Sequence, residues 1–361
     1  MRLRVLMLST PVGPLGSGLG GGVEFTVTRL AKELATRGHR ITIAAPADST
    51  LPFRHQHVEL VQISGGWQTT AQSQDRSAPA VTSPVLANLW AYARQAQDDY
   101  DLLVNFAYDW LPFYLTPFFK TPVAHFVSMG SLSDVMDAAI AAQPPHHLAA
   151  YTRTQANTFK SVPPKSWAIL NGGLDISLYS SHNRPLDFLA WVGRIAPEKG
   201  LEDAIAACVH TGRQLRIFGK VDNDAYWQSI QRQIAESDAD VNYCGFLSSA
   251  DLVQQLSQAL ALIMTPKWIE AFGIVAIEAL ACGVPVIAYA RGGPAEIVRH
   301  GETGWLVEPD SVEGLCNAIA RIPDIDRWRC REQAEAAYSL SAWGDRAEQW
   351  FYQLLSSTIS D

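Results

Sequence analysis

The chain has 361 residues, 48% of them hydrophobic and 18% charged, which is a globular composition and enough length for two domains of about 170 residues each. Its formal charge of −8, without a Lys/Arg-rich run, argues against sequence-independent binding to nucleic acid. No stretch approaches the ~20 apolar residues that span a bilayer, and residues 1–8 lack a full signal-peptide core, so we expect a cytoplasmic protein without integral membrane association.

The first half of the chain has the order of elements of a parallel α/β domain. A Gly/Pro-rich stretch at 10–22 precedes residues 24–37, where apolar side chains recur near helical spacing. The Pro163-Pro164 pair interrupts the pattern, and we place the end of the domain at residue 166. The predicted strands are 5–9, 39–45, 101–105 and 122–127.

The second half has the same order of elements without repeating the sequence. Strands are predicted at 188–192 and 215–218, with a loop at 193–200 and a helix at 201–209 between them. We therefore predict an α/β fold with two Rossmann-like domains. Residues 341–356 have apolar side chains near helical spacing and predict a terminal helix that docks on another element.

Two glutamates flank the predicted start of a helix, in the string Glu270-Ala-Phe-Gly-Ile-Val-Ala-Ile-Glu278. If Gly273 opens this helix, both carboxylates lie near its N-terminus, where backbone N–H groups favour an anion. Carboxylates accept hydrogen bonds from vicinal hydroxyls, so the pair suits a ligand with two polyol units joined by phosphate. By itself the pattern is short, and one surface Glu plus one Glu complementing the helix dipole is the simpler interpretation.

Two cations lie on the loop that follows a predicted strand. Arg194 and Lys199 occur in Trp191-Val-Gly-Arg-Ile-Ala-Pro-Glu-Lys-Gly200, at the carboxyl edge where α/β folds bind ligands. Arg offers a planar fork and Lys a point charge, which together can neutralise a diphosphate. The alternative is two solvated loop cations.

With these segments, and with Ala290–Val298 and Gly301–Val307, the sequence resembles the retaining family 4 glycosyltransferases of GT-B fold. The resemblance implies two Rossmann-like domains that face each other across a cleft. Residues 1–166 would bind the acceptor, residues 167–340 the nucleotide sugar, and residues 341–361 would form a helix returning to the first domain.

The same resemblance implies roles for individual residues. Arg194 and Lys199 would bind the donor diphosphate and, with Glu270, carry catalysis. Glu270 would contact sugar hydroxyls, Glu278 the ribose, and the segment 243–247 the nucleobase. The other donor-binding residues that it implies are Gly20, Gly21, Gly22, Ala271, Phe272, Gly273 and Ile274.

The N-terminal glycines allow a second interpretation. Gly16-Ser-Gly-Leu-Gly-Gly21 spells the G-x-G-x-x-G of dinucleotide-binding proteins, which would favour a nicotinamide-dependent oxidoreductase. However, these glycines begin several residues after the strand, and the acidic candidate Asp48 lies further along than the expected separation of about 20 residues. The triplet at 20–22 instead resembles the glycine loop of the transferases, whose backbone can approach phosphate closely.

Candidate acceptor residues lie in the first domain. They are Gly16, Glu24, Asp109, Ser128 and Met129. Many family members have a His where Met129 stands, and we expect the nearby His125 to be a buried, hydrogen-bonded core residue. Asp109 is an acidic candidate and equally a helix cap.

The segments Ser9–Glu24 and Ser128–Ser131 are also similar to the cyanobacterial UDP-glucose:tetrahydrobiopterin α-glucosyltransferases. This resemblance implies UDP-glucose as the donor and a reduced pterin as the acceptor. The predicted helix 24–37 carries only Arg29, Lys32 and Arg37 as basic residues, which favours a small soluble acceptor over a membrane-bound one.

Three Asp-x-Asp strings, which bind metal in another transferase fold, are read here as helix caps and turns. We therefore expect no metal and no cofactor beyond the nucleotide-sugar substrate. The alternatives left open are a family 4 transferase with another sugar, a glycan or lipid acceptor, or a non-catalytic nucleotide-sugar-binding protein.

Overall fold

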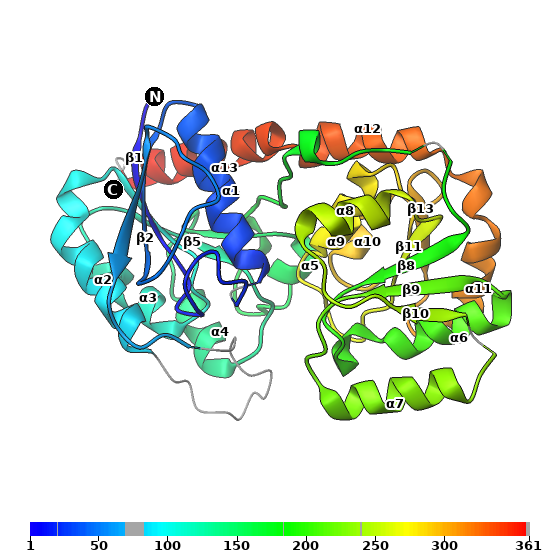
Figure 1. Cartoon of the computed structure of the whole chain (residues 1–361). Helices are drawn as coiled ribbons and strands as arrows, with labels where there is room; N and C mark the ends of the chain where they lie inside the picture. The colour runs from blue at the N-terminus through cyan, green and yellow to red at the C-terminus, as the bar shows by residue number, and fades with distance from the viewer. Residues whose placement is uncertain (20, 69–82, 183, 239, 359–361) are drawn as a thin grey trace. The chain divides into compact units, whose positions relative to one another are not determined.

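The computed structural model describes residues 1–361 except 20, 69–82, 183, 239 and 359–361. The chain divides into two compact units, which Figure 1 shows as ribbons. The first unit comprises Met1–Gly173 and Leu340–Asp361, and the second comprises Leu174–Ser339. Each unit contains one sheet of parallel strands with helices on its faces, so the predicted α/β fold with two Rossmann-like domains is confirmed.

The sheet of the first unit has the strand order β3-β2-β1-β4-β5-β6-β7. Its strands pair in parallel, and its central strands are buried because helices cover both faces. The strands are β1 (Arg4–Leu8), β2 (Arg40–Pro46), β3 (Val58–Ile63), β4 (Leu102–Asn105), β5 (Val123–Val127), β6 (Leu148–Ala150) and β7 (Trp167–Ile169).

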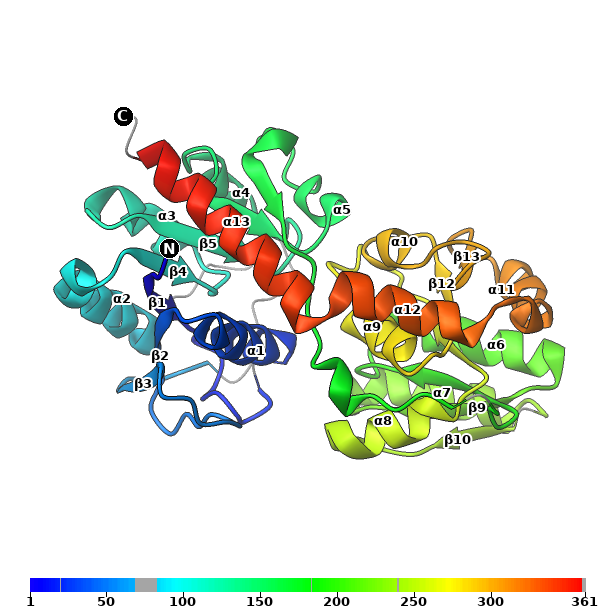
Figure 2. The same ribbon diagram turned by 90° about the horizontal axis from the view of Figure 1, so that it is seen from above.

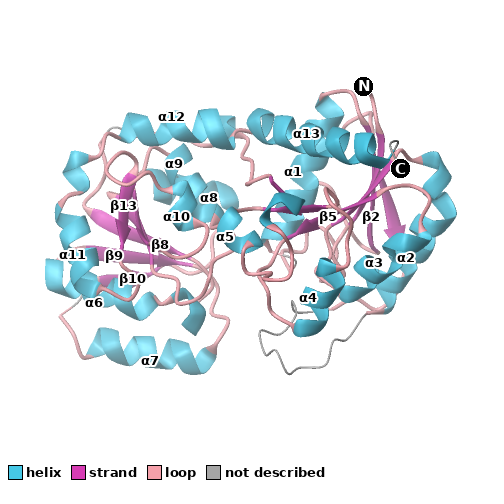
Figure 3. Ribbon diagram, turned by 180° about the vertical axis from the view of Figure 1, so that it is seen from behind, coloured by secondary structure: helices cyan, strands magenta, loops and turns pink. Residues whose placement is uncertain are grey.

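Helices α1 and α13 pack against each other on one face of this sheet, and α2, α3 and α4 lie on the other (Figure 3). The α-helices of the first unit are α1 (Gly22–Thr36), α2 (Pro84–Ala96), α3 (Trp110–Leu115), α4 (Asp134–Ala141), α5 (Arg153–Ala156) and α13 (Leu340–Thr358). Short 3-10 turns occur at η1 (Gln97–Asp99), η2 (Thr116–Phe118) and η3 (Pro164–Ser166).

The boundary between the units differs from the one expected after residue 166. Strand β7 pairs with β6, with Trp167 opposite Leu148, so this segment belongs to the first sheet. The first unit therefore continues to Gly173. A Cβ atom on Gly173 would lie 2.6 Å from the ring of Trp343 in α13, so a glycine is needed where this helix packs.

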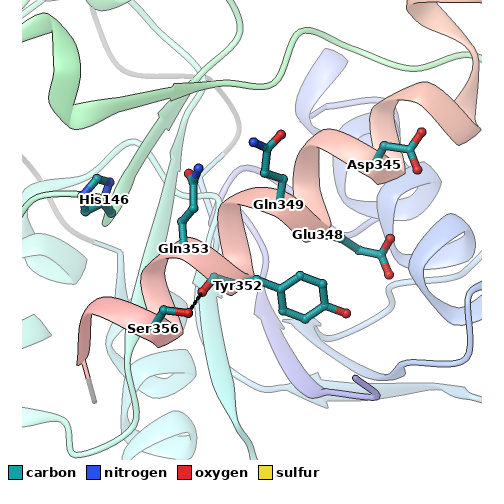
Figure 4. Close-up of a pocket in the computed structure, with 7 residues that line it drawn as sticks. All are labelled: His146, Asp345, Glu348, Gln349, Tyr352, Gln353 and Ser356. Atoms are coloured by element: carbon teal, nitrogen blue, oxygen red, sulfur yellow. Dashed lines mark hydrogen bonds between the residues drawn. The ribbon is translucent and has the colours of Figure 1, made fainter. Parts of the chain in front are cut away.

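Helix α13 is held to the first unit by apolar and ionic contacts (Figure 2). Trp343, Trp350 and Phe351 are buried. Arg37 donates to Glu348 at 2.6 Å, and His39 Nε2 lies 2.7 Å from the other oxygen of the same carboxylate. The outer side of α13 borders a shallow hollow lined by polar side chains (Figure 4).

The sheet of the second unit has the order β10-β9-β8-β11-β12-β13, and its strands also pair in parallel. Its strands are β8 (Phe188–Val192), β9 (Gln214–Phe218), β10 (Val241–Tyr243), β11 (Ala261–Met264), β12 (Val286–Tyr289) and β13 (Gly304–Val307).

Helix α6 packs against α7 and α11, whereas α9 packs against α8 and α12 (Figure 1). The α-helices of the second unit are α6 (Leu201–Thr211), α7 (Asp224–Ala235), α8 (Ser249–Ser257), α9 (Ile274–Ala281), α10 (Pro294–Ile297), α11 (Val312–Ala320) and α12 (Arg327–Tyr338). The 3-10 turns are η4 (Ile176–Leu178), η5 (Pro197–Lys199) and η6 (Ile322–Asp324). Among the described residues, no helix combines the length and apolar character needed to cross a membrane.

Candidate functional site

The predicted donor residues of the second unit lie where its strand order reverses. Strands β8 and β11 are neighbours, β9 and β10 extend the sheet on one side, and β12 and β13 extend it on the other. Open α/β sheets bind ligands outside the carboxyl ends of the strands at such a point. The loop after β8 carries Arg194 and Lys199, and the loop after β11 carries Glu270.

Lys199 and Glu270 are in contact at this edge. The Lys199 ammonium group forms an ion pair with Oε2 of Glu270, and the side chains are 20% and 15% exposed. The indole N–H of Trp268 donates to the same Oε2 at 3.0 Å, and Lys199 Nζ lies 5.0 Å from the centroid of the Trp268 ring. Oε1 of Glu270 has no hydrogen bond to any residue that the structure describes. One carboxylate oxygen is therefore held by the protein, and the other remains open to a ligand.

Arg194 points to other partners. Its guanidinium group donates to Asp222 and, at 2.9 Å, to Glu198, and the side chain is 49% exposed. Exposed ion pairs contribute about 0–1 kcal/mol, so these contacts compete only weakly with an incoming anion. The structure thus brings two of the three predicted catalytic residues together and places Arg194 on the solvent side of the same loop.

Glycines allow the loops around Glu270 to pack backbone against backbone. A Cβ atom on Gly292 would lie 2.4 Å from the carbonyl oxygen of Glu270, and one on Gly293 would lie 2.0 Å from that of Phe272. The N–H of Gly293 donates to the Glu270 carbonyl oxygen at 2.7 Å. A Cβ atom on Gly200 would likewise lie 2.1 Å from the carbonyl oxygen of Thr265. These contacts fix the backbone that carries both Lys199 and Glu270.

Gly273 has a φ of 91° and is the N-cap residue of α9, so the helix begins where the sequence predicted. Glu278 lies on this helix, and one of its oxygens accepts a hydrogen bond from the Tyr179 hydroxyl at 3.0 Å. Tyr179 is buried, and Arg331 donates to its carbonyl oxygen at 2.5 Å. The sequence analysis missed Tyr179, because a lone tyrosine outside the motif resembles a core residue.

Of the remaining motif residues, Phe272 is buried and its ring lies 6.3 Å from that of Tyr338, whereas Ala271 and Ile274 are half-buried. The Cys282 thiol at the end of α9 is buried, and burial with the nearby Glu278 charge raises its pKa to about 12. At neutral pH this thiol stays protonated, so it is not a nucleophile.

A charged network that the sequence did not predict holds the first residues of the loop that carries Glu270. Lys267 pairs with Asp203 and with Asp310, and Arg291 donates to Asp310 at 2.6 Å and to the Pro266 carbonyl oxygen at 2.8 Å. The hydrogen bond from Arg291 lowers the pKa of the Asp310 carboxyl. The network ties together loops that follow β11, β12 and β13, so it supports the position of Trp268 and Glu270.

The segment expected near the nucleobase exposes two aromatic rings. Phe246 is 78% exposed, and Tyr243 packs against Trp227 with ring centroids 4.7 Å apart. The Tyr243 hydroxyl donates to the Gly219 carbonyl oxygen at 3.0 Å, which orients the ring. Both rings lie at or just beyond the carboxyl end of β10, on the same edge as Lys199.

In the first unit, the glycine loop also follows a strand at a reversal point, between β1 and β4. The carboxylate of Glu24 is buried and accepts hydrogen bonds from the backbone N–H groups of Gly16 at 2.7 Å and Gly18 at 3.3 Å. Glu24 therefore holds the backbone of the glycine loop in a defined conformation. Gly21 caps α1 and Gly22 is its first residue, with open space where a side chain would be, while Gly20 lies outside the described residues.

The other acceptor candidates lie at the ends of β4 and β5. Asp109 is buried and caps α3 by accepting from the Leu111 N–H at 2.9 Å. Ser128 and Met129 follow β5; Ser128 is buried and Met129 half-buried, and the Met129 carbonyl oxygen accepts from the Gln155 side chain at 2.9 Å. Their roles toward an acceptor remain predictions.

His125 lies in the core of the first unit. Its Nε2 is 2.8 Å from the Thr116 hydroxyl, its Nδ1 is 3.2 Å from the Asn105 amide, and its ring stacks on Phe113 at 4.2 Å. Burial, with a smaller contribution from His147, lowers the pKa of His125 well below its ordinary value. The expectation of a buried, hydrogen-bonded histidine is confirmed.

Comparison with known proteins now identifies the fold. The family model for glycosyl transferases group 1 matches residues 180–339, and that for Glycosyltransferase Family 4 matches residues 20–127. The chain is a glycosyltransferase of GT-B fold. It belongs with enzymes that transfer a sugar from a nucleotide-sugar donor.

Among curated relatives of this glycosyltransferase, D-inositol 3-phosphate glycosyltransferase of Corynebacterium glutamicum is 26% identical, with 99% of this chain and 97% of that protein covered. An exopolysaccharide phosphotransferase of Streptomyces coelicolor is 37% identical over 135 residues, which are 36% of this chain and only 14% of that protein.

Two solved structures share the fold over nearly the whole chain. Sucrose-phosphate synthase of Thermosynechococcus elongatus has a TM-score of 0.80 at 23% identity and covers 99% of this chain and 100% of its own. HepE of Anabaena, solved in complex with UDP, has a TM-score of 0.75 at 18% identity and covers 97% and 100%.

Proposed function

We propose that the glycosyltransferase moves glucose from UDP-glucose to a small soluble acceptor, with retention at the anomeric carbon and without a metal ion. The observation that carries the donor assignment is the Lys199–Glu270 pair at the reversal point of the second sheet. It supplies a cation for the diphosphate and an open carboxylate oxygen for a sugar hydroxyl. Glu278, oriented by Tyr179, is suited to the ribose hydroxyls, and HepE with bound UDP supports a uridine nucleotide.

In the proposed reaction, the bond from the anomeric carbon to the diphosphate breaks and a bond to the acceptor oxygen or nitrogen forms on the same face. The acceptor proton passes to the departing diphosphate, which leaves as UDP, so no side-chain base is required. Negative charge develops on the diphosphate, and preorganised donors near it lower the barrier. Lys199, Arg194 and the N-terminus of α9 at Gly273 are the donors that we assign to this task.

For the acceptor we propose a reduced pterin, supported by the resemblance of Ser9–Glu24 and Ser128–Ser131 to pterin glucosyltransferases. Glu24 holds the Gly16–Gly18 backbone, which gives that loop a defined shape. In this proposal Glu24 holds the acceptor loop in shape, and Gly16 and Ser128 border the acceptor. Asp109 has an indirect role, because it caps the start of α3. A different sugar, or a glycan or lipid acceptor, is the alternative within the same fold.

The donor assignment is tested by measuring UDP release from a panel of nucleotide sugars with the wild-type chain, Glu270→Gln and Arg194→Ala. We expect Glu270→Gln to lower kcat/KM for the preferred donor about 10–100-fold, the cost of a charge-assisted hydrogen bond. Near-normal rates in both variants would refute it. Binding of UDP-glucose without UDP release for any acceptor would identify a nucleotide-sugar-binding protein instead.

The acceptor assignment is tested separately by mass spectrometry of a reaction with UDP-glucose and tetrahydrobiopterin. A hexosylated pterin that is absent when Glu270→Gln replaces the wild-type chain supports the proposal. UDP release with other acceptors but no hexosylated pterin removes the pterin and leaves the transferase. Reactions with and without a metal chelator test metal independence, and the anomeric configuration of the product tests retention.

A further inference from the structure

Two different donors converge on one oxygen of Glu270. The Lys199 ammonium group and the Trp268 indole N–H both bind Oε2, while Oε1 has no partner among the described residues. Lys199 is also assigned to the donor diphosphate under the proposed function. A diphosphate carries more negative charge than a carboxylate, so its arrival draws the ammonium group away from Glu270.

The two donors differ in freedom of movement. An ammonium group on a four-carbon stem follows the strongest nearby anion, whereas the indole N–H is fixed by the orientation of its ring. Trp268 directly follows Lys267, which is paired with Asp203 and Asp310, and Pro266 accepts a hydrogen bond from Arg291. The backbone beside Trp268 is thus tied to the charged network, so its indole N–H remains in place when Lys199 moves.

We propose that Trp268 is a positioning residue for the donor sugar: its indole N–H holds Glu270 by Oε2 while Lys199 turns to the diphosphate. This inference rests on the proposed function, because it assumes a donor that has both a diphosphate and a sugar. Without the indole N–H, Glu270 keeps no donor on Oε2 once Lys199 has turned to the phosphate, so it no longer presents Oε1 to the sugar in a fixed position. Trp268 therefore separates recognition of the sugar from recognition of the nucleotide.

The test compares the affinities for UDP and UDP-glucose by calorimetry, using the full chain and Trp268→Phe, which keeps an aromatic ring beside Lys199. We expect Trp268→Phe to weaken UDP-glucose binding about tenfold and UDP binding less than about twofold. Trp328→Phe is the matched control, because Trp328 is 64% exposed on α12, and we expect it to change neither affinity.

A double-mutant cycle shows whether Trp268 acts through Glu270. If it does, Trp268→Phe adds no further loss of UDP-glucose affinity to Glu270→Gln. Additive losses, equal losses for UDP and UDP-glucose, or unchanged UDP-glucose binding in Trp268→Phe would overturn the inference while leaving the donor assignment intact. A wild-type chain that binds neither UDP nor UDP-glucose would overturn the donor assignment and the inference with it.

Discussion

The close approach of Gly292 to Glu270 leads to a quantitative prediction for Gly292→Ala. The added Cβ would lie 2.4 Å from the Glu270 carbonyl oxygen and 2.5 Å from its nitrogen, whereas ordinary contact begins at 3.4 Å. The Glu270 backbone must therefore move by about 1 Å, and a displacement of that size in an active site costs about 10²-fold in rate. We expect kcat/KM for the preferred nucleotide sugar to fall by that factor.

Gly212→Ala is the matched control for this prediction. Gly212 has a φ of 63° and Gly292 a φ of 71°, so an alanine at either position has the same unfavourable left-handed backbone, which costs about 1–2 kcal/mol. No heavy atom lies within 4 Å of the Cβ that would be added at Gly212. Urea unfolding of both variants measures the backbone strain that they share. Steady-state kinetics measures the displacement of Glu270, which only Gly292→Ala is expected to cause. Equal kcat/KM values for the two folded variants would refute the reasoning that the Gly292 contact positions Glu270.

Two further predictions concern Glu348 and Tyr179. Although burial raises the pKa of the Glu348 carboxyl, hydrogen bonds from His39 and Arg37 lower it, so the ionised group stabilises the folded chain. Glu348→Gln is expected to lower the free energy of unfolding by about 1–2 kcal/mol at pH 7. This difference from the wild-type chain should shrink as the pH falls below the ordinary range of a Glu carboxyl, and it should vanish once the pH has passed the lowered pKa of Glu348 in the folded chain. A difference that stays constant in urea titrations as the pH is lowered from 7 through the acidic range would contradict this. Tyr179→Phe removes the hydroxyl that holds Glu278, so we expect the KM for the nucleotide sugar to rise about 3–10-fold with little change in kcat. An unchanged KM would show that Tyr179 does not orient Glu278.

Local sequence patterns were sufficient to place Lys199 at the carboxyl edge of a strand and Glu270 in the loop before a helix, but not to bring the two together. The structure joins them because Glu270 follows β11, a neighbour of β8, and the carboxyl ends of parallel strands meet at one edge. The domain boundary was harder to predict, because β7 has only three residues and its membership depends on a pairing with β6. A strand of that length has too little periodicity to assign it to either sheet.

The hydrogen-bond partners of the site residues depend on packing that the sequence pattern does not encode. Glu24 and Asp109 have the acidic side chains that the acceptor assignment required, yet both are buried and bound to backbone N–H groups. Trp268 and Tyr179 are aromatic, so composition suggests core packing, and only the direction of their polar atoms reveals a link to the glutamates. For Trp268 one signal was available, since it lies two residues before Glu270 in a loop.

The two candidate diphosphate cations differ in exposure, in a chain whose net charge is −8. Each is already paired with carboxylates of the protein, Arg194 with Asp222 and Glu198, and Lys199 with Glu270. Arg194 is more exposed, so leaving its partners costs little, and it is suited to swing toward an arriving diphosphate. Lys199 is less exposed and lies at the reversal point of the sheet, so once its ammonium group has turned from Glu270 to the diphosphate it stands beside the charge that develops on the leaving group. The proposed function therefore assigns recruitment of the donor mainly to Arg194 and stabilisation of the departing diphosphate mainly to Lys199.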